Sequence, residues 1–212
     1  MKTTDLIAAL AAEAPAVRRA PVTRLVGLGV IVGAVLALAL LVAWLGMRDL
    51  DQAIHTTAYW MKTLYTLAFA SSGLWLVRRL ARPGGAPGGA AVLAAGAFAV
   101  MVVLAGVELA QAGPEQWRAL WMGHTMPLCS LRILALSTPV YLGIAVALRR
   151  LAPTRLAMTG AAAGLLAGGA GATVYGLYCD ESAVTFVTAW YTVGMGLSAG
   201  LGALIGSRLL RW

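Results

Sequence analysis

Apolar runs of about twenty residues recur along the whole chain and constrain its fold more than any other feature. Six are present, over residues 25–45, 57–77, 90–110, 132–148, 156–175 and 183–205. Each is long enough to cross a bilayer as a helix, and no ten-residue alternation typical of a membrane barrel interrupts them. The sequence therefore predicts an all-α polytopic membrane protein, with residues 22–212 forming a bundle of six transmembrane helices.

The charged residues predict how those spans are oriented. The chain carries a formal net charge of +8, which would suggest nucleic-acid binding if the charges were clustered on one surface. Instead, twelve of the sixteen Lys and Arg residues fall before the first span, after the last span, or in every second loop between spans: Lys2, Arg18, Arg19, Arg24, Arg78, Arg79, Arg82, Arg149, Arg150, Arg155, Arg208 and Arg211. The positive-inside rule then places both termini in the cytoplasm of a bacterial inner membrane. The excess charge indicates topology, and we expect no direct contact with nucleic acid.

The opposite side carries most of the acids and only two loop arginines, Arg48 and Arg118. Its acidic residues are Asp49, Asp51, Glu108, Glu115, Asp180 and Glu181. Glu108 ends the third run and Arg132 begins the fourth, so the two side chains can pair at the outer boundary. Lys62 lies inside the second run, where snorkelling to the surface is favoured over a transport role.

Residues 1–21 form the one extended segment on the cytoplasmic side. The stretch TTDLIAALAAEAP reads as a short helix in which Thr4 caps the start, Asp5 faces the helix dipole and Pro15 stops it. Leu6, Ile7 and Leu10 form an apolar stripe at helical spacing. Such a helix either orders in the groove of a partner protein or lies on membrane lipids, helped by the arginines that follow it.

Two further patterns describe the interior and the outer loop. Small residues recur at every fourth position in the last two runs: Gly160, Gly164, Gly168, Gly194, Ser198, Gly202 and Gly206. Their spacing predicts close helix packing rather than a ligand site. In the outer loop over residues 111–130, Pro114 can start a helix that places Trp117, Leu120 and Trp121 on one face, at the level of the lipid headgroups.

The two cysteines are the strongest candidates for chemistry. Cys129 opens the fourth run and Cys179 closes the fifth, which places both thiols on the outer, oxidising side. The short inner loop between these runs predicts that their outer ends adjoin. The pair is then either a structural staple or a sensor of oxidant or metal, in which Arg132 favours the thiolate of Cys129 while Asp180 and Glu181 assist metal binding. No other metal-ligand or catalytic motif is present, and no resident cofactor is expected.

The residues quoted above together resemble the NrsF-type family of six-span bacterial anti-sigma factors, the negative regulators of sigma F. The likeness covers nearly the whole chain, and it is most specific in residues 148–212, which include GLYCDESAVTF, and in the opening MKTTDLIAALAAEAP. The cysteines fall where the family carries its pair. Tyr178 departs from the pattern, since a histidine is expected before the second cysteine, and this weakens a metal site that would use it.

The resemblance implies that the protein is not an enzyme. It implies that the protein holds an extracytoplasmic-function (ECF) sigma factor at the membrane and that Cys129 and Cys179 take part in its release under metal or oxidative stress. The residues expected to contact the sigma factor are Thr4, Asp5, Leu6, Ile7 and Leu10. From the residues alone, two other functions stay open: a small multi-pass transporter, and a membrane thiol oxidoreductase that uses the two cysteines.

Overall fold

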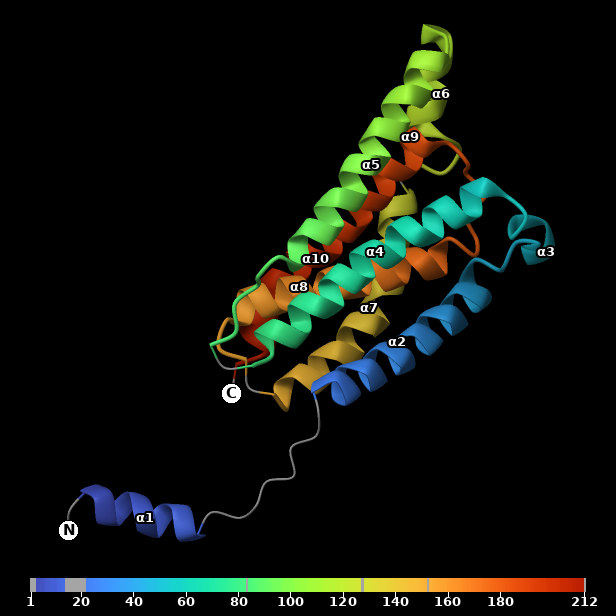
Figure 1. Cartoon of the computed structure of the whole chain (residues 1–212). Helices are drawn as coiled ribbons and strands as arrows, with labels where there is room; N and C mark the ends of the chain where they lie inside the picture. The colour runs from blue at the N-terminus through green and yellow to red at the C-terminus, as the bar shows by residue number, and fades with distance from the viewer. Residues whose placement is uncertain (1–2, 14–21, 83, 127, 152, 212) are drawn as a thin grey trace.

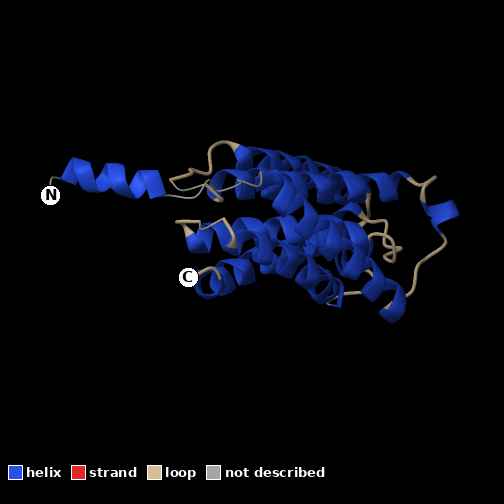
Figure 2. Cartoon of the chain, turned by 90° about the horizontal axis from the view of Figure 1, so that it is seen from below, coloured by secondary structure: helices blue, strands red, loops and turns tan. Residues whose placement is uncertain are grey.

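The computed structural model describes residues 3–13, 22–82, 84–126, 128–151 and 153–211, and every regular element in these ranges is helical. Figure 1 shows a bundle of long helices, with a short N-terminal helix apart from it. The long helices are α2 (Val22–Trp44), α4 (Thr57–Leu80), α5 (Ala90–Gln111), α7 (Leu128–Arg149), α8 (Leu156–Tyr175) and α10 (Thr192–Leu209). The shorter ones are α1 (Thr3–Glu13), α3 (Leu50–Ala53), α6 (Pro114–Met122), α9 (Val184–Phe186) and the π-helical turn η1 (Val187–Tyr191). Figure 2 shows the same helices from below.

The helices follow the apolar runs closely, and α9, η1 and α10 together form the last run as one continuous helix. In the described residues, five helices are long and apolar enough to span a membrane: α2, α5, α7, α8 and the Val184–Leu209 helix. The sixth, α4, has 24 residues, but Lys62 and several Ser and Thr residues make it more polar. The polytopic membrane class is thus supported, whereas a sixth span rests on the place of α4 in the same bundle.

Successive long helices run in opposite directions, so the bundle has two chemically different ends (Figure 1). The arginine end, defined by Arg78, Arg79, Arg149, Arg150 and Arg208, gathers the last turns of α4, α7 and α10. The thiol end, defined by Cys129 and Cys179, gathers the opposite helix ends and the acidic loops. This separation of charge is the one that the sequence predicts for the two sides of a membrane.

The rows of small residues on α8 and α10 face each other, as their spacing predicts. A Cβ atom added at Gly160 would lie 2.2 Å from the carbonyl oxygen of Gly202, and one added at Gly164 would lie 2.2 Å from that of Ser198. These distances leave no space for a side chain, so the two backbones are in direct contact. On its other faces α8 packs against α4 and α7, which places it at the centre of the bundle.

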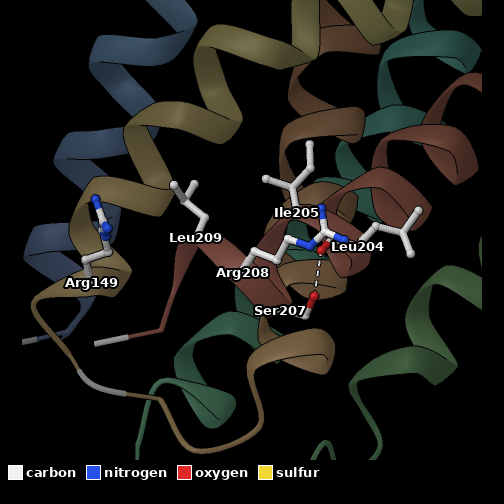
Figure 3. A pocket seen from close by; sticks show the side chains of 6 residues that line it. All are labelled: Arg149, Leu204, Ile205, Ser207, Arg208 and Leu209. Carbon is white, nitrogen blue, oxygen red and sulfur yellow. Dashed lines mark hydrogen bonds between the residues drawn. The ribbon is translucent and has the colours of Figure 1, made fainter.

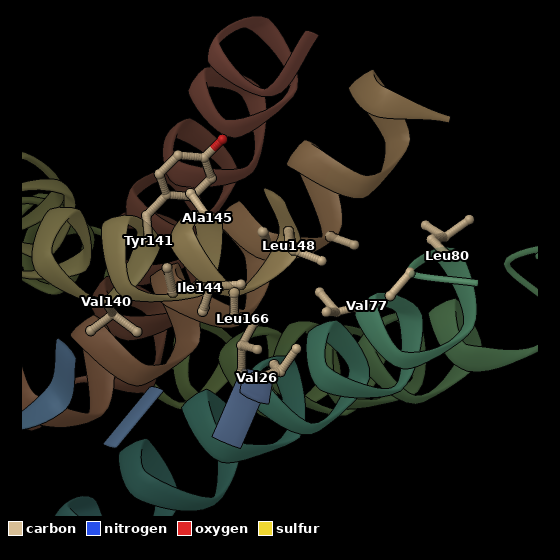
Figure 4. Packing of buried hydrophobic residues seen from close by; sticks show 14 of the residues in the cluster. Val26, Val77, Leu80, Val140, Tyr141, Ile144, Ala145, Leu148 and Leu166 are labelled. Atoms are coloured by element: carbon tan, nitrogen blue, oxygen red, sulfur yellow. The ribbon is translucent and has the colours of Figure 1, made fainter. Parts of the chain in front are cut away.

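Two clusters of buried side chains fill the interior. The cluster drawn in Figure 4 lies toward the arginine end and includes Val26, Val77, Ile144, Leu148 and Leu166, from four helices. The second cluster lies toward the thiol end and includes both cysteines together with Tyr175, Tyr191 and Phe186. The second cluster therefore holds the residues for which the sequence predicts chemistry.

Candidate thiol site and partner helix

The two thiols lie in one buried cluster at the thiol end. Cys129 sits in the first turn of α7, where its main-chain N–H donates to the Thr125 carbonyl at 3.1 Å. Cys179 follows the end of α8, and its N–H donates to the Tyr175 carbonyl at 3.0 Å. Both are free cysteines, and both are 0% exposed. The structure thus brings together two residues separated by 50 positions in the chain, and any reagent must open the cluster to reach them.

Lys62 binds the segment that carries Cys179. Its side chain is only 2% exposed, and its ammonium donates to the main-chain carbonyls of Cys179, at 3.0 Å, and of Glu181. The expectation that Lys62 snorkels to the surface is therefore wrong. The physical reason is local: Cys179 and Glu181 are not helical, so their carbonyls lack intrahelical partners and accept from a buried cation instead.

Glu181 ties the same segment to the loop before α7. Its carboxylate accepts from the main-chain N–H of His124 and lies 3.5 Å from the Thr125 hydroxyl. Glu181 is buried, whereas Asp180 is exposed. The carboxylate is thus directed at the loop, not at a metal beside Cys179. Within the described ranges, no group of three or more His, Cys, Asp and Glu residues is arranged to hold a metal ion.

Glu108 and Arg132 have separate partners instead of pairing with each other. The Glu108 carboxylate accepts from the N–H groups of Val184 and Thr185, at 2.9 and 2.7 Å, and from the Thr185 hydroxyl at 2.6 Å. It thereby caps the start of the last helix from a neighbouring helix. Arg132 lies over the ring of Tyr178, 5.4 Å from its centroid. The residue that replaces the expected histidine therefore serves as an aromatic platform for Arg132.

Two tyrosines beside the thiols were missed by sequence reasoning. Tyr175 and Tyr191 are fully buried in the cysteine cluster, with ring centroids 5.8 Å apart. Their hydroxyl groups are buried without a hydrogen-bond partner in the described structure. Unpaired buried hydroxyls are costly, so the cluster is a polar environment that is not fully satisfied. Their only sequence signal is the density of tyrosine around Cys179.

The π-helical turn η1 connects the thiol site to α10. The Ser130 hydroxyl, adjacent to Cys129, donates to the Trp190 carbonyl at 2.7 Å, and the Trp190 indole donates to the Trp121 carbonyl at 2.8 Å. A π turn leaves main-chain groups without regular helical partners and is common at functional sites. Ser130 thereby joins the first turn of α7 to η1, which directly precedes α10.

The helix predicted for partner binding is present as α1. It begins at Thr3, so Thr4 lies inside the first turn and does not act as the cap that the sequence suggests. Asp5 is in the first turn, as expected. Leu6, Ile7 and Leu10 are exposed, and Figure 1 shows α1 separated from the bundle. Residues 14–21, including the predicted stop at Pro15, lie outside the described residues.

Comparison with known proteins shows which family the chain is similar to. Residues 10–212 match the family model described as negative regulator of sigma F. The anti-sigma-F factor NrsF of Caulobacter vibrioides is 40% identical over 215 residues, and the probable anti-sigma-F factor NrsF of Azospira oryzae is 37% identical over 213 residues. Both alignments cover the whole of each chain. No solved structure matches the chain.

Proposed function

We infer that this chain, which belongs to the NrsF family of negative regulators of sigma F, is a membrane anti-sigma factor for an ECF sigma factor. The observation that carries this function is the full-length similarity to two anti-sigma-F factors, 40% and 37% identical. The family consists of regulators and not enzymes, so thiol oxidoreductase chemistry is set aside. The same similarity makes a regulator a better account of the chain than a transporter.

We propose that α1 is the surface that binds the sigma factor. Its exposed stripe of Leu6, Ile7 and Leu10 is the kind of face that an amphipathic helix buries in the groove of a partner. Thr4 and Asp5, in the first turn, are placed at the edge of the same contact. A short helix of this kind gains its stability from the partner, because isolated helices of this length are marginal in water.

We propose that all six long helices cross the bacterial inner membrane, with the arginine end and both termini in the cytoplasm. The support is the gathering of arginine at one end of the bundle and acids at the other. The antiparallel course of α4 beside α8 and α5 also supports a sixth span, because it leaves Lys62 buried among protein groups and not facing lipid. In this orientation the thiol end faces the periplasm.

We propose that Cys129 and Cys179 form the site at which metal or oxidant releases the sigma factor. Two thiols in one cluster, beside two unpaired hydroxyls, offer soft ligands for a heavy-metal ion bound transiently, or the partners of a disulfide. Either event would move the first turn of α7 relative to the segment that Lys62 holds. The bond between Ser130 and Trp190 and the direct contact of α10 with α8 are rigid connections from there toward the arginine end.

Co-purification of the sigma factor with the full-length protein tests this function. Leu6→Asp with Leu10→Asp places two charges in the proposed interface. Each buried leucine contributes about 1.5–3 kcal/mol, so binding should weaken by about two orders of magnitude or more. The matched control, Ala8→Asp with Ala12→Asp, adds the same charges on the opposite face of α1 and should retain the sigma factor. Equal retention by both variants, at normal protein level in the membrane, would refute the assignment of α1.

A further inference from the structure

A pocket opens between α7 and α10 at the arginine end, far from the thiols. It has a volume of about 610 Å³ and is lined by Arg149, Leu204, Ile205, Ser207, Arg208 and Leu209. Figure 3 shows the two arginines on different helices, with Leu209 between them and with Ile205 and Leu204 beside the guanidinium of Arg208. The pocket thus combines positive charge at its mouth with an apolar wall.

A hydrogen bond joins the same two helices further from the arginine end. The Tyr141 hydroxyl donates to the Gly202 carbonyl at 3.1 Å and joins α7 to α10. Arg149 lies eight positions beyond Tyr141, and Arg208 lies six positions beyond Gly202. At 1.5 Å per residue, the arginines lie roughly 9–12 Å along the helices from this bond.

Among the described residues, no acidic side chain of the bundle lies at the same end as the arginines of the pocket. The described acids of the bundle lie at the thiol end: Asp49, Asp51, Glu108, Glu115, Asp180 and Glu181. Below the arginines, Leu204 is 69% exposed and Ile205 is 46% exposed on the bundle surface. An occupant of this pocket must therefore supply negative charge at the helix ends and an apolar chain along α10.

We propose that the pocket between α7 and α10 binds an anionic phospholipid. Its phosphate lies between Arg149 and Arg208, and one acyl chain follows the groove along Leu204 and Ile205. Basic pockets between membrane helices on the cytoplasmic side bind anionic headgroups for this reason. A second groove carries a single arginine, Arg150, above an apolar wall formed by α2 and α7. Two lining arginines, against one in the second groove, make the pocket between α7 and α10 the better site. The proposal requires only that the bundle spans a bilayer, and it is independent of sigma-factor binding.

Lipid titration of the purified full-length protein, read by native mass spectrometry, tests the proposal. Phosphatidylglycerol should bind more tightly than phosphatidylcholine. Arg149→Gln with Arg208→Gln should weaken phosphatidylglycerol binding by about 30-fold, since each arginine at an anionic surface contributes a factor of about five. The control, Arg24→Gln with Arg118→Gln, removes the same charge from exposed positions outside the pocket and should change binding less than two- to threefold, roughly.

Two further arms separate a lipid pocket from simple charge attraction. Leu204→Trp fills the groove while both arginines remain, and it should also weaken phosphatidylglycerol binding. Soluble glycerol phosphate, which has the charge but no acyl chain, should not compete. Unchanged binding in Arg149→Gln with Arg208→Gln, equal affinity for phosphatidylcholine, or full competition by glycerol phosphate would each overturn the proposal. So would arginine variants that keep lipid affinity and lose the sigma factor, because the pocket would then belong to the protein partner.

Discussion

The ammonium of Lys62 lies 3.0 Å from the carbonyl oxygen of Cys179, a residue 117 positions further along the chain. The same ammonium also donates to the carbonyl of Glu181, whose carboxylate binds the loop before α7. One buried cation on α4 and one buried carboxylate thus hold the segment that carries the second thiol. We expect Cys179 to become accessible only when these bonds open, so Lys62 would govern its exposure in the proposed sensor.

Lys62→Met should expose Cys179 to reagents. The substitution leaves two buried carbonyls without their charged donor, and a hydrogen bond to a charged group contributes roughly 1.5–3 kcal/mol. A loss of about 2 kcal/mol corresponds to an opening of the segment about 30 times more frequent. Maleimide labelling of Cys179 in the purified protein should accelerate by a similar factor. Arg79→Met, which removes a cation at the arginine end, is the control, and equal labelling rates in the two variants would contradict the role of Lys62.

Glu108→Ala should destabilise the start of the last helix. The carboxylate accepts three hydrogen bonds from Val184 and Thr185, so its removal leaves two main-chain N–H groups unpaired at a helix N-terminus. We expect a loss of about 2 kcal/mol in the free energy of unfolding, measured in detergent. Glu115→Ala removes an acid from exposed α6 and should be nearly neutral. A stability loss that is the same in both variants would mean that Glu108 acts only through its charge.

Gly164→Ala should destabilise the contact between α8 and α10, although alanine is the better helix former. The added Cβ would lie 2.2 Å from the Ser198 carbonyl oxygen, and overpacking of this kind costs about 1–3 kcal/mol. Gly196→Ala is the matched control on α10, because nothing lies within 4 Å of its added Cβ. It should be neutral or stabilising. Thermal unfolding of the two variants distinguishes them, and a neutral Gly164→Ala would contradict the packing.

Cysteine labelling in intact spheroplasts tests the proposed six-span topology. A cysteine introduced at Asp51, at the thiol end, should react with an impermeant maleimide. One introduced at Gly89, just before α5, should react only after the membrane is permeabilised, and nothing lies within 4 Å of its added Cβ. Labelling of both positions in intact spheroplasts would mean that α4 does not cross the membrane. Labelling of Gly89→Cys alone would mean that the orientation is the reverse of the proposed one.

The sequence predicts the helices well because each is defined by its own local composition. The 156–175 run coincides with α8, and the rows that contain Gly160 and Gly202 face each other as their spacing requires. The helix that starts at Pro114 is also present, with Trp117 and Trp121 exposed on α6. In these cases the interactions that determine the structure lie within one segment, or between two segments joined by a short turn.

The chemistry of the thiol end could not be predicted in the same way. Lys62 and Glu108 find their partners across the bundle, 117 and 76 positions away, and hydropathy alone indicates a snorkelling lysine and a surface ion pair. Their partners are main-chain carbonyls in an irregular segment and main-chain N–H groups at a helix start. No side-chain motif in the sequence predicts where such groups lie. The buried hydroxyls of Tyr175 and Tyr191 depend on the same three-dimensional arrangement.

The central claim is that Cys129 and Cys179 control release of the sigma factor. The most direct measurement is expression of a sigma-dependent reporter in cells that carry Cys129→Ser with Cys179→Ser, with and without heavy metal or oxidant. The account predicts that protein abundance and resting repression stay normal and that induction is lost. Induction that survives in the double variant would contradict the sensor. Low abundance together with failed repression in unstressed cells would instead identify the cysteines as a structural staple.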